Sequence, residues 1–486
     1  MNLSPTKEQV AVMASSDNLV KVKAAAGSGK TSTIKLYSDK NVQPSIYLAF
    51  NKSIAAEVQG KLGGHVVAKT THSLAFSQEG KKVRHKLVRP KGGYVNVAST
   101  PSEISKYFNL QPIMFGGAVL INTTTLGLLI RNTVNNFQAS SDKSLELKHV
   151  SGLYRAVLKT LDIEDYEFEY LENNIRDKVL VFAKRLWKKR VDKNSPVLAT
   201  HDTYLKLYQL SNPKLNYDII YLDEAQDTTD CVLDIVMSQK GHAKIIMVGD
   251  DFQAIYSWRG AINAMSKISS DGYQLTKSFR FGNEIAKVAR AIIKNKLPIV
   301  GNEDIKSVVG LNVVDTSKKY TKIYRTNGGL LEDAIKFISE GLKVSAEVNA
   351  KDFIKVLESA EALFQGDLKK VKHDLVMPYK NWYELTQDSK VVPELGRVCK
   401  IIENREAIVY INCIKQLQKR DDADIILTTA HKSKGREWDQ VVLANDFKTN
   451  EEVVLSQEEI NLLYVAATRA IKRLNINQAV SSLINY

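Results

Sequence analysis

The stretch "AAAGSGKTST", residues 24–33, constrains the fold of this chain more than any other feature. It follows the apolar run "LVKV" and precedes a segment typical of a helix, so it predicts a strand, a phosphate-binding loop and a helix. Ala24 stands where the strict pattern has a first glycine, whereas Gly27 and Gly29 remain. These glycines allow successive backbone N–H groups to point at phosphate oxygens. The alternative, a glycine-rich turn without a ligand, is disfavoured by an acidic strand farther along the chain.

That acidic strand is "YDIIYLDEAQDTTD", in which four apolar residues precede Asp223 and Glu224. Lys30 of the loop would neutralise the β- and γ-phosphates, and the Thr31 hydroxyl would bind Mg²⁺. Asp223 would hold the same metal through water, while Glu224 would orient and deprotonate the attacking water. Two carboxylates are needed because one neutralises the metal and the other must stay free as a base. The pair predicts hydrolysis of ATP with Mg²⁺ as cofactor.

Length and charge limit the possible architectures and partners. A chain of 486 residues exceeds one ordinary core, so two to four domains are expected. Its 68 Lys and Arg outweigh 54 Asp and Glu, which suits a polyanion such as nucleic acid. The cysteines lie far apart without a CxxC pair, which favours neither a zinc ribbon nor a disulfide framework. No apolar run reaches membrane-spanning length and the first residues lack a signal-peptide core, so we expect a soluble intracellular protein, cytoplasmic and nucleoid-associated if it is bacterial or viral.

Two series of strand-like runs predict an α/β fold with sites at the carboxyl ends of the strands. The first series is "NLVKVKAAAG", "SIYLAF", "YDIIYLDEA" and "AKIIMVGDD", and the second is "YTKIYRTNGG", "ADIILTTAHKSKG" and "DQVVLANDF". Helix-rich sequence interrupts the first series between about residues 78 and 195 and the second between about 335 and 415. No flexible Gly/Ser tract joins these parts, so we expect packed crossings between domains.

The segment "VGDDFQAIYSWRGA", residues 248–261, combines several kinds of chemistry. Gln253 is suited to sensing a charged ligand, Tyr256 and Trp258 to stacking on flat rings, and Arg259 to binding phosphate. A packed turn explains the same residues equally well when the segment is taken alone.

Hydrolysis also requires positive charge directed at the γ-phosphate. Arg280 in "TKSFRFGNE" and Arg469 in "LLYVAATRAIKRL" are candidate arginine fingers. An arginine on a helix is more often solvated or ion-paired, so this alternative stays open for both residues.

The order of the motifs resembles the UvrD-like superfamily 1A DNA helicases, and within them the branch of the F-box DNA helicase. The resemblance spans nearly the whole chain through the P-loop and the segments "LSPTKEQ", "AFNKSIA", "KTTHSLA", "LDEAQD", "VGDDFQAIYSWRGA", "SFR", "YRTN", "TTAHKSKGREWD" and "LLYVAATRA". "FNKSIA" and "NLLYVA" are the segments most similar to the F-box branch. No F-box precedes the motor motifs and no nuclease-like segment follows them, so ubiquitin-ligase recruitment and nuclease activity are not expected.

The resemblance implies two RecA-like P-loop motor domains, each with a mainly helical insertion. The expected bounds are residues 1–78 and 195–275 for the first motor domain, 79–194 for its insertion, 276–335 and 415–486 for the second motor domain, and 336–414 for a reduced second insertion.

The resemblance also assigns roles in nucleotide binding. Gln9 would read the adenine edge, Phe279 would stack on its ring, and Glu437 would bind the ribose. Gln253 would sense the γ-phosphate, with Arg280 and Arg469 as the two fingers. The phosphates would lie on the loop residues Ala26, Gly27, Ser28, Gly29, Lys30, Thr31 and Ser32, although Ser32 occupies a position where UvrD-type motors carry arginine.

Along the nucleic-acid track the resemblance implies contacts by Phe50, His72, Tyr256, Trp258, Arg259, Arg325, Asn327 and His431. Thr71 replaces an aromatic residue of the family, which removes one stacking platform. "LAFNK" is one residue shorter than its UvrD counterpart, and Arg436 stands where the family often has leucine.

These assignments imply an ATP-dependent translocase on single-stranded DNA that unwinds duplexes 3′ to 5′ as a monomer, binds single/double-strand junctions and works with repair, recombination or replication proteins. One alternative is a translocase that strips proteins such as recombinase filaments; another is a binding module switched by ATP. RNA is also compatible with stacking and phosphate contacts. The basic segments at residues 81–93 and 183–190, the latter with Trp187, suit either a duplex contact or a solvated helix face.

Overall fold

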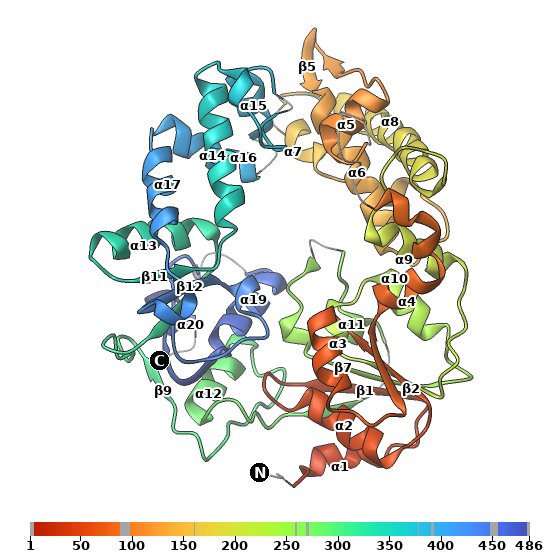
Figure 1. Ribbon diagram of the computed structural model, residues 1–486, viewed down its shortest axis with the longest axis vertical. Coiled ribbons are helices and arrows are strands. Elements are labelled where there is room, and N and C mark those ends of the chain that lie inside the picture. Colours follow the sequence, from red (N-terminus) through yellow and green to blue (C-terminus); the bar gives the residue numbers. More distant parts are fainter. Residues whose placement is uncertain are drawn as a thin grey trace.

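The computed structural model describes residues 4–87, 98–159, 161–257, 260–268, 272–377, 379–389, 393–447 and 455–483. Two six-stranded sheets dominate these residues, with strand orders β3-β2-β6-β7-β1-β8 and β11-β12-β10-β13-β14-β9 (Figure 1). Their pairings are parallel, so the predicted α/β class is confirmed. The first sheet consists of β1 (Leu19–Ala24), β2 (Ser45–Ala49), β3 (Val66–Thr70), β6 (Ile219–Leu222), β7 (Lys244–Gly249) and β8 (Tyr273–Leu275). The second consists of β9 (Val308–Gly310), β10 (Tyr320–Tyr324), β11 (Val344–Ala346), β12 (Ile425–Thr429), β13 (Trp438–Leu443) and β14 (Ala470–Asn475).

Helices cover both faces of each sheet, which explains why β2, β6 and β12 are buried along their whole length. The helices of the first motor domain are α1 (Lys7–Met13), α2 (Lys30–Lys40), α3 (Lys52–Gln59), α4 (Thr71–Gln78), α9 (His201–Leu210), α10 (Asp230–Met237) and α11 (Ala264–Lys267). Those of the second are α12 (Asn283–Ile292), α13 (Asn327–Ser339), α18 (Ala430–Ser433), α19 (Gln457–Ala467) and α20 (Gln478–Leu483).

Several helices begin directly after a strand because a polar side chain caps their first turn. The side chain of Asn51 accepts a hydrogen bond from the N–H of Ile54 at the start of α3, and Thr70 does the same for Ser73 at the start of α4. Such caps satisfy N–H groups that have no partner within the helix. They place the residues after β2 and β3 at the same edge of the sheet as the phosphate-binding loop.

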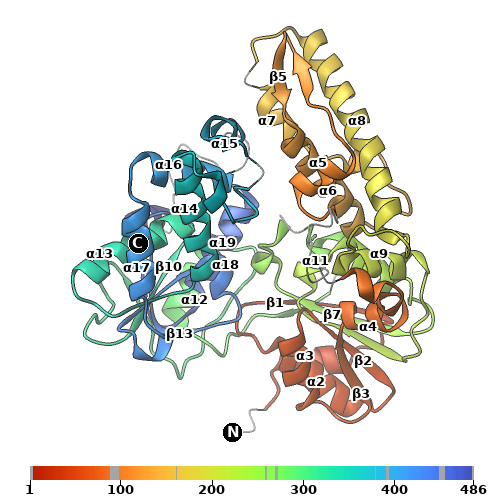
Figure 2. The same cartoon turned by 45° about the horizontal axis from the view of Figure 1, so that its top comes forward.

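Two insertions lie on the same side of the sheets and face each other (Figures 1 and 2). The first contains α5 (Pro101–Tyr107), the hairpin β4 (Ile113–Phe115) and β5 (Ala118–Ile121), α6 (Thr123–Ala139), α7 (Tyr154–Leu158) and the long α8 (Asp165–Val191). The second contains α14 (Ala350–Phe364), α15 (Trp382–Ser389), α16 (Pro393–Glu403) and α17 (Ala407–Gln416). The expected range of 336–414 for the second insertion also includes β11, which pairs with β12 and so belongs to the sheet.

The two motor domains share an apolar core. Ala25 and Ala26 of the phosphate-binding loop and Ile255 pack in one buried cluster with residues of α12 and α19. In the described ranges, no helix is long and apolar enough to cross a membrane.

Candidate active site

The phosphate-binding loop connects β1 to α2, as the sequence predicts. Gly27 and Gly29 have φ of +72° and +79°, a region that glycine adopts without steric cost. A β-carbon on Gly27 would lie 2.6 Å from Cβ of Arg280 and 2.7 Å from Oγ of Ser278. The loop therefore needs glycine both for its turn and for its close contact with the second motor domain.

The acidic residues after β6 meet the start of α2. Nζ of Lys30 lies 3.2 Å from Oε2 of Glu224, and the hydroxyl of Thr31 donates to Oδ2 of Asp223 at 3.3 Å. The structure thus brings together the side chains predicted to bind phosphate, metal and water.

Burial and neighbouring charges shift the pKa values of this cluster. Burial alone would lower the pKa of Lys30, but Glu224, Asp250 and Asp223 together raise it. Burial also opposes ionisation of Glu224, yet Lys30 and Lys434 outweigh this effect and lower the pKa of Glu224 to about 2. Burial and the neighbouring Glu224 raise the pKa of Asp223. Glu224 is therefore ionised at neutral pH.

Two side chains that the sequence analysis missed hold these carboxylates. The hydroxyl of Tyr47 donates to Oδ2 of Asp223. The buried amide of Gln226 donates from Nε2 to Oε2 of Glu224 at 2.5 Å, and its Oε1 accepts from the N–H of Asp250 at 2.9 Å. The motif "LDEAQD" marks Gln226 only as a neighbour of the acidic pair, and Tyr47 lies in an apolar run that indicates nothing but a strand.

The second motor domain contacts the loop directly. The backbone N–H of Ala26 donates to the hydroxyl of Tyr464 at 3.1 Å, and Tyr464 donates to Oδ2 of Asp250 at 3.2 Å. Oγ of Ser278 donates to the carbonyl of Ala26, and the N–H of Phe279 donates to the carbonyl of Gly27, both at 2.8 Å. Tyr464, on α19, was also missed because it reads as one more apolar-face residue of a helix.

The two candidate arginine fingers lie at this interface. Nε of Arg280 donates to Oε2 of Glu437 at 2.6 Å. Arg469 is 1% exposed, and its Nη2 donates to Oε1 of Gln253 at 3.4 Å. Burial, followed by the charge of Arg280, lowers the pKa of Arg469 to about 9. Both arginines therefore face the groups predicted to surround the phosphates.

The remaining candidate nucleotide residues differ in environment. Gln9 is buried, donates from Nε2 to Thr33 at 3.1 Å and accepts from the N–H of Thr6 at 3.0 Å. Oγ of Ser28 is buried without a hydrogen-bond partner among the described residues, whereas Ser32 is exposed. The Phe279 ring lies 3.5 Å from the position of a β-carbon on Gly29.

Three rings of the predicted nucleic-acid track form a row across the two motor domains. The rings of Phe50 and Tyr256 are stacked, with centroids 5.7 Å apart, and the His431 ring lies 6.3 Å from Tyr256. Nζ of Lys434 lies 5.1 Å from the centroid of Tyr256. Phe50, His72 and Tyr256 also line one cavity of about 610 Å³ that reaches Asp223 and Glu224.

Other track residues already have side-chain partners or lie elsewhere. His72 contacts Oδ1 of Asp202 at 3.0 Å, and Arg325 donates to both carboxylate oxygens of Glu459. Asn327 begins α13 and lines a different cavity. Trp258 and Arg259 lie outside the described residues.

The structure shows how two residues of the basic segments are packed. Trp187 is partly buried and packs edge-on against Phe137, with centroids 5.3 Å apart, at the margin of the core of the first insertion. Buried Lys86 donates to the carbonyls of Lys189 and Arg190 and thereby caps the end of α8. The part of the first segment beyond residue 87 lies outside the described residues.

Comparison with known proteins adds independent findings. Residues 5–271 match the model of the UvrD/REP helicase N-terminal domain, and residues 424–476 match that of the UvrD-like helicase C-terminal domain. F-box DNA helicase protein 1 of Schizosaccharomyces pombe is 31% identical over 96% of this chain and 56% of its own length. F-box DNA helicase 1 of Gallus gallus is 31% identical over 96% of this chain and 48% of its own length. DNA helicase II of Escherichia coli is 25% identical over 67% of this chain and 47% of its own length. The chain spans about half the length of these relatives.

Proposed function

Because the chain belongs to the UvrD/Rep helicase family, we propose that it is an ATP-dependent DNA helicase that steps along single-stranded DNA. Two facts about Gln253 carry this proposal. Its side chain contacts Arg469 of the nucleotide site, and it lies only three residues before Tyr256 in the row of rings. A single short segment thus joins the nucleotide site to the row of rings.

The residues present fit ATP and Mg²⁺. The positive φ of Gly27 and Gly29 shapes a loop that admits close backbone approach, and buried Ser28 Oγ lacks a partner among the described residues. Lys30 would hold the phosphates, while Thr31 and Asp223 would hold the metal. Bound ATP with Mg²⁺ would supply the phosphoanhydride that is hydrolysed.

Glu224 would accept the proton of the attacking water. Its pKa of about 2 keeps it ionised at neutral pH, and Gln226 fixes one of its oxygens. Arg280 and Arg469 would stabilise charge that develops on the phosphate oxygens. Gln9, Phe279 and Glu437 are proposed to contact adenine and ribose, which requires Glu437 to give up its present bond to Arg280.

Lys434 would transmit the state of the nucleotide to the track. Its Nζ donates to Oδ2 of Asp227 and to the carbonyl of Gln253, each at 2.5 Å, and also lies over the Tyr256 ring. A change at Gln253 would therefore alter the surroundings of Tyr256 within a few residues of backbone. A base stacked on such a ring contributes about 1 to 3 kcal/mol without being read for its identity.

The proposed track consists of Phe50, His72, Tyr256, Trp258, Arg259, Arg325, Asn327 and His431. For Arg325, binding of DNA requires the ion pair with Glu459 to open or rotate. Movement 3′ to 5′ is proposed from the resemblance to the family. Opening a duplex costs about 1.4 kcal/mol per base-pair step, so one ATP per base pair is energetically feasible.

The proposal predicts that single-stranded DNA accelerates ATP turnover and that Glu224→Gln abolishes it. Gln keeps the shape and hydrogen bonding of the side chain but cannot act as a base, so turnover should fall at least about 100-fold. Steady-state phosphate release with and without oligothymidylate measures both effects, and binding of a fluorescent ATP analogue checks that the site is intact. Turnover that persists in Glu224→Gln would exclude this base.

A further inference from the structure

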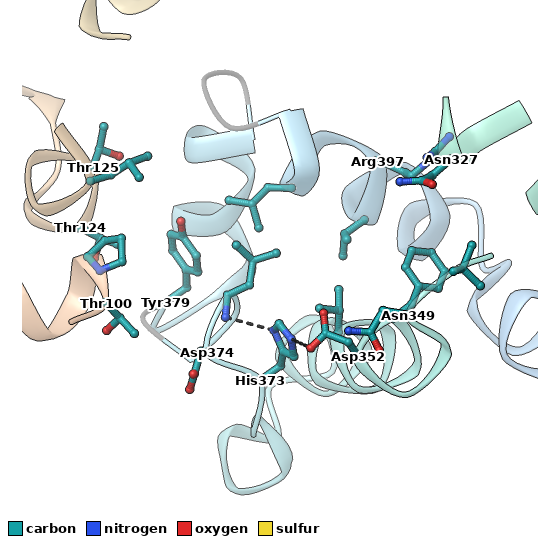
Figure 3. A pocket seen from close by; sticks show the side chains of 18 of the residues that line it. Thr100, Thr124, Thr125, Asn327, Asn349, Asp352, His373, Asp374, Tyr379 and Arg397 are labelled. Carbon is teal, nitrogen blue, oxygen red and sulfur yellow. Dashed lines mark hydrogen bonds and ion pairs between the residues drawn. The ribbon is translucent and has the colours of Figure 1, made fainter. Parts of the chain in front are cut away.

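A second cavity, of about 750 Å³, lies between the first insertion and the second half of the chain (Figure 3). Thr100, Thr124 and Thr125 of the first insertion form one side. Asn327 of the second motor domain and Arg397 of the second insertion lie at the opposite side. Most of this second half lies between the two segments that match family models, so those models assign no role to Arg397.

The cavity continues the row of rings. Lys432, which lines it, directly follows His431, whose ring lies 6.3 Å from Tyr256. Asn327, another predicted track residue, lines it as well. The cavity therefore begins one residue beyond the last ring of the row.

The charged side chains that line the cavity differ in whether they already form hydrogen bonds or ion pairs within the protein. Asp352 contacts His373 at 3.1 Å, and Nζ of Lys432 donates to the carbonyl of Glu347 at 2.6 Å. Asp374 also lies on the wall. The guanidinium of Arg397, by contrast, forms no hydrogen bond or close ion pair with any residue in the described ranges, although the charges of Glu332 and Asp446 act on it.

The absence of a side chain at Gly328 leaves room for the Arg397 guanidinium. A β-carbon on Gly328, in the first turn of α13, would lie 1.3 Å from Nη2 of Arg397. The side chain thus rests against the backbone beside Asn327, half-buried and with donors left over. A guanidinium with free donors beside an amide side chain matches the oxygens of a phosphodiester.

We propose that this cavity binds the backbone of the single strand beyond the row of rings, with Arg397 and Asn327 contacting one phosphate. This inference rests on the proposed function and adds the second insertion to the track. A DNA strand bound in this way would link the second insertion, through Arg397, to the second motor domain, through Asn327, at the same phosphate.

The test compares binding of fluorescent oligothymidylate by the full chain, without nucleotide, at several salt concentrations. Arg397→Gln should weaken binding about tenfold, as expected for one charge-assisted contact. It should also reduce the slope of log affinity against log salt by about 0.7, the contribution of one phosphate on a single strand. Lys400→Gln is the matched control because it removes the same charge from the exposed face of the same helix, α16.

A second variant, at Gly328, keeps the positive charge of Arg397 but displaces its guanidinium. Gly328→Ala suits the first turn of a helix but displaces the flexible guanidinium, so it should weaken binding without unfolding the protein. Arg397→Lys should retain most of the salt slope.

Equal affinities and slopes for Arg397→Gln and Lys400→Gln would overturn the inference and leave the motor proposal standing. Binding of pyrophosphate is measured on the same variants. If Arg397→Gln weakens binding of pyrophosphate but leaves binding of oligothymidylate unchanged, the cavity binds a small anion and the inference is overturned too. Failure of the unaltered chain to bind oligothymidylate would overturn the proposed function instead.

Discussion

Glu224 adopts a backbone conformation that residues with a β-carbon rarely take, with φ of +50°. Its N–H donates to Oδ1 of Asp223 at 2.8 Å, and Gln226 holds its carboxylate. Unusual backbone geometry of this kind is often retained where a side chain must be aimed at a reacting group. Here it directs the carboxylate at Lys30, which supports the proposed role as base.

Sequence alone could predict the meeting of Lys30 with Glu224 because each follows a strand of one parallel sheet. It could not predict Tyr47 or Tyr464, since an aromatic residue inside an apolar run indicates only a strand or a helix face. Which polar atom a buried tyrosine reaches depends on how distant elements pack. The same limit applies to Trp187, whose basic neighbours suggest a surface while its ring packs, partly buried, against the core of the first insertion.

Asp227 should make the free energy of unfolding depend on pH between 7 and 5. Burial, which outweighs the attraction of Lys434, raises the pKa of Asp227 to about 6. In the unfolded chain this carboxyl titrates near 4, so only the folded protein takes up the proton between pH 7 and 5. The contribution of Asp227 to stability therefore increases as the pH falls, by about 1 kcal/mol over this range.

Urea unfolding of the unaltered chain and of Asp227→Asn at pH 5 and pH 7 measures this contribution. The difference between the two proteins should favour the unaltered chain by about 1 kcal/mol more at pH 5 than at pH 7. An identical difference at both pH values would contradict a raised pKa.

The phosphate-binding loop is the element on which both motor domains converge. It bonds to β8 through the N–H of Ala25, and to Ser278, Phe279 and Tyr464 beyond that strand. The predicted strand, loop and helix are therefore present, but their contact with α19 depends on the packing of two domains. No pattern within "AAAGSGKTST" contains that information.

Gly27→Ala should weaken ATP binding at least about tenfold, because the new β-carbon is both strained at φ of +72° and directed at Arg280. Gly341→Ala is the matched control, since Gly341 has φ of +84° but nothing within 4 Å of its added β-carbon. Titration with a fluorescent ATP analogue measures the affinity of each variant. Equal weakening by both variants would show that backbone strain, and not the contact with Arg280, is what matters.

At the scale of the whole molecule, two parallel sheets place the nucleotide residues at their shared interface and the two insertions on one side of it (Figures 1 and 2). Strand patterns predicted β1, β2, β6 and β7 of the first sheet and β10, β12 and β13 of the second, but not β3, β8, β9, β11 or β14. The strand β11, for example, is too short and too isolated in sequence to be separated from the helix-rich segment around it. The bonds from Ala26 and Gln253 to α19 residues and to Arg469 make relative movement of the domains sensitive to the site. This arrangement is what a motor driven by opening and closing requires.

The measurement that tests the motor proposal most directly is unwinding of duplexes with a 3′ tail, a 5′ tail or no tail, with ATP turnover recorded on the same substrates. Glu224→Gln serves as the control without hydrolysis. The proposal predicts ATP-dependent unwinding of the 3′-tailed duplex, little on the other two, none by Glu224→Gln, and turnover stimulated by the single-stranded tail. ATP turnover that ignores single-stranded DNA would contradict it.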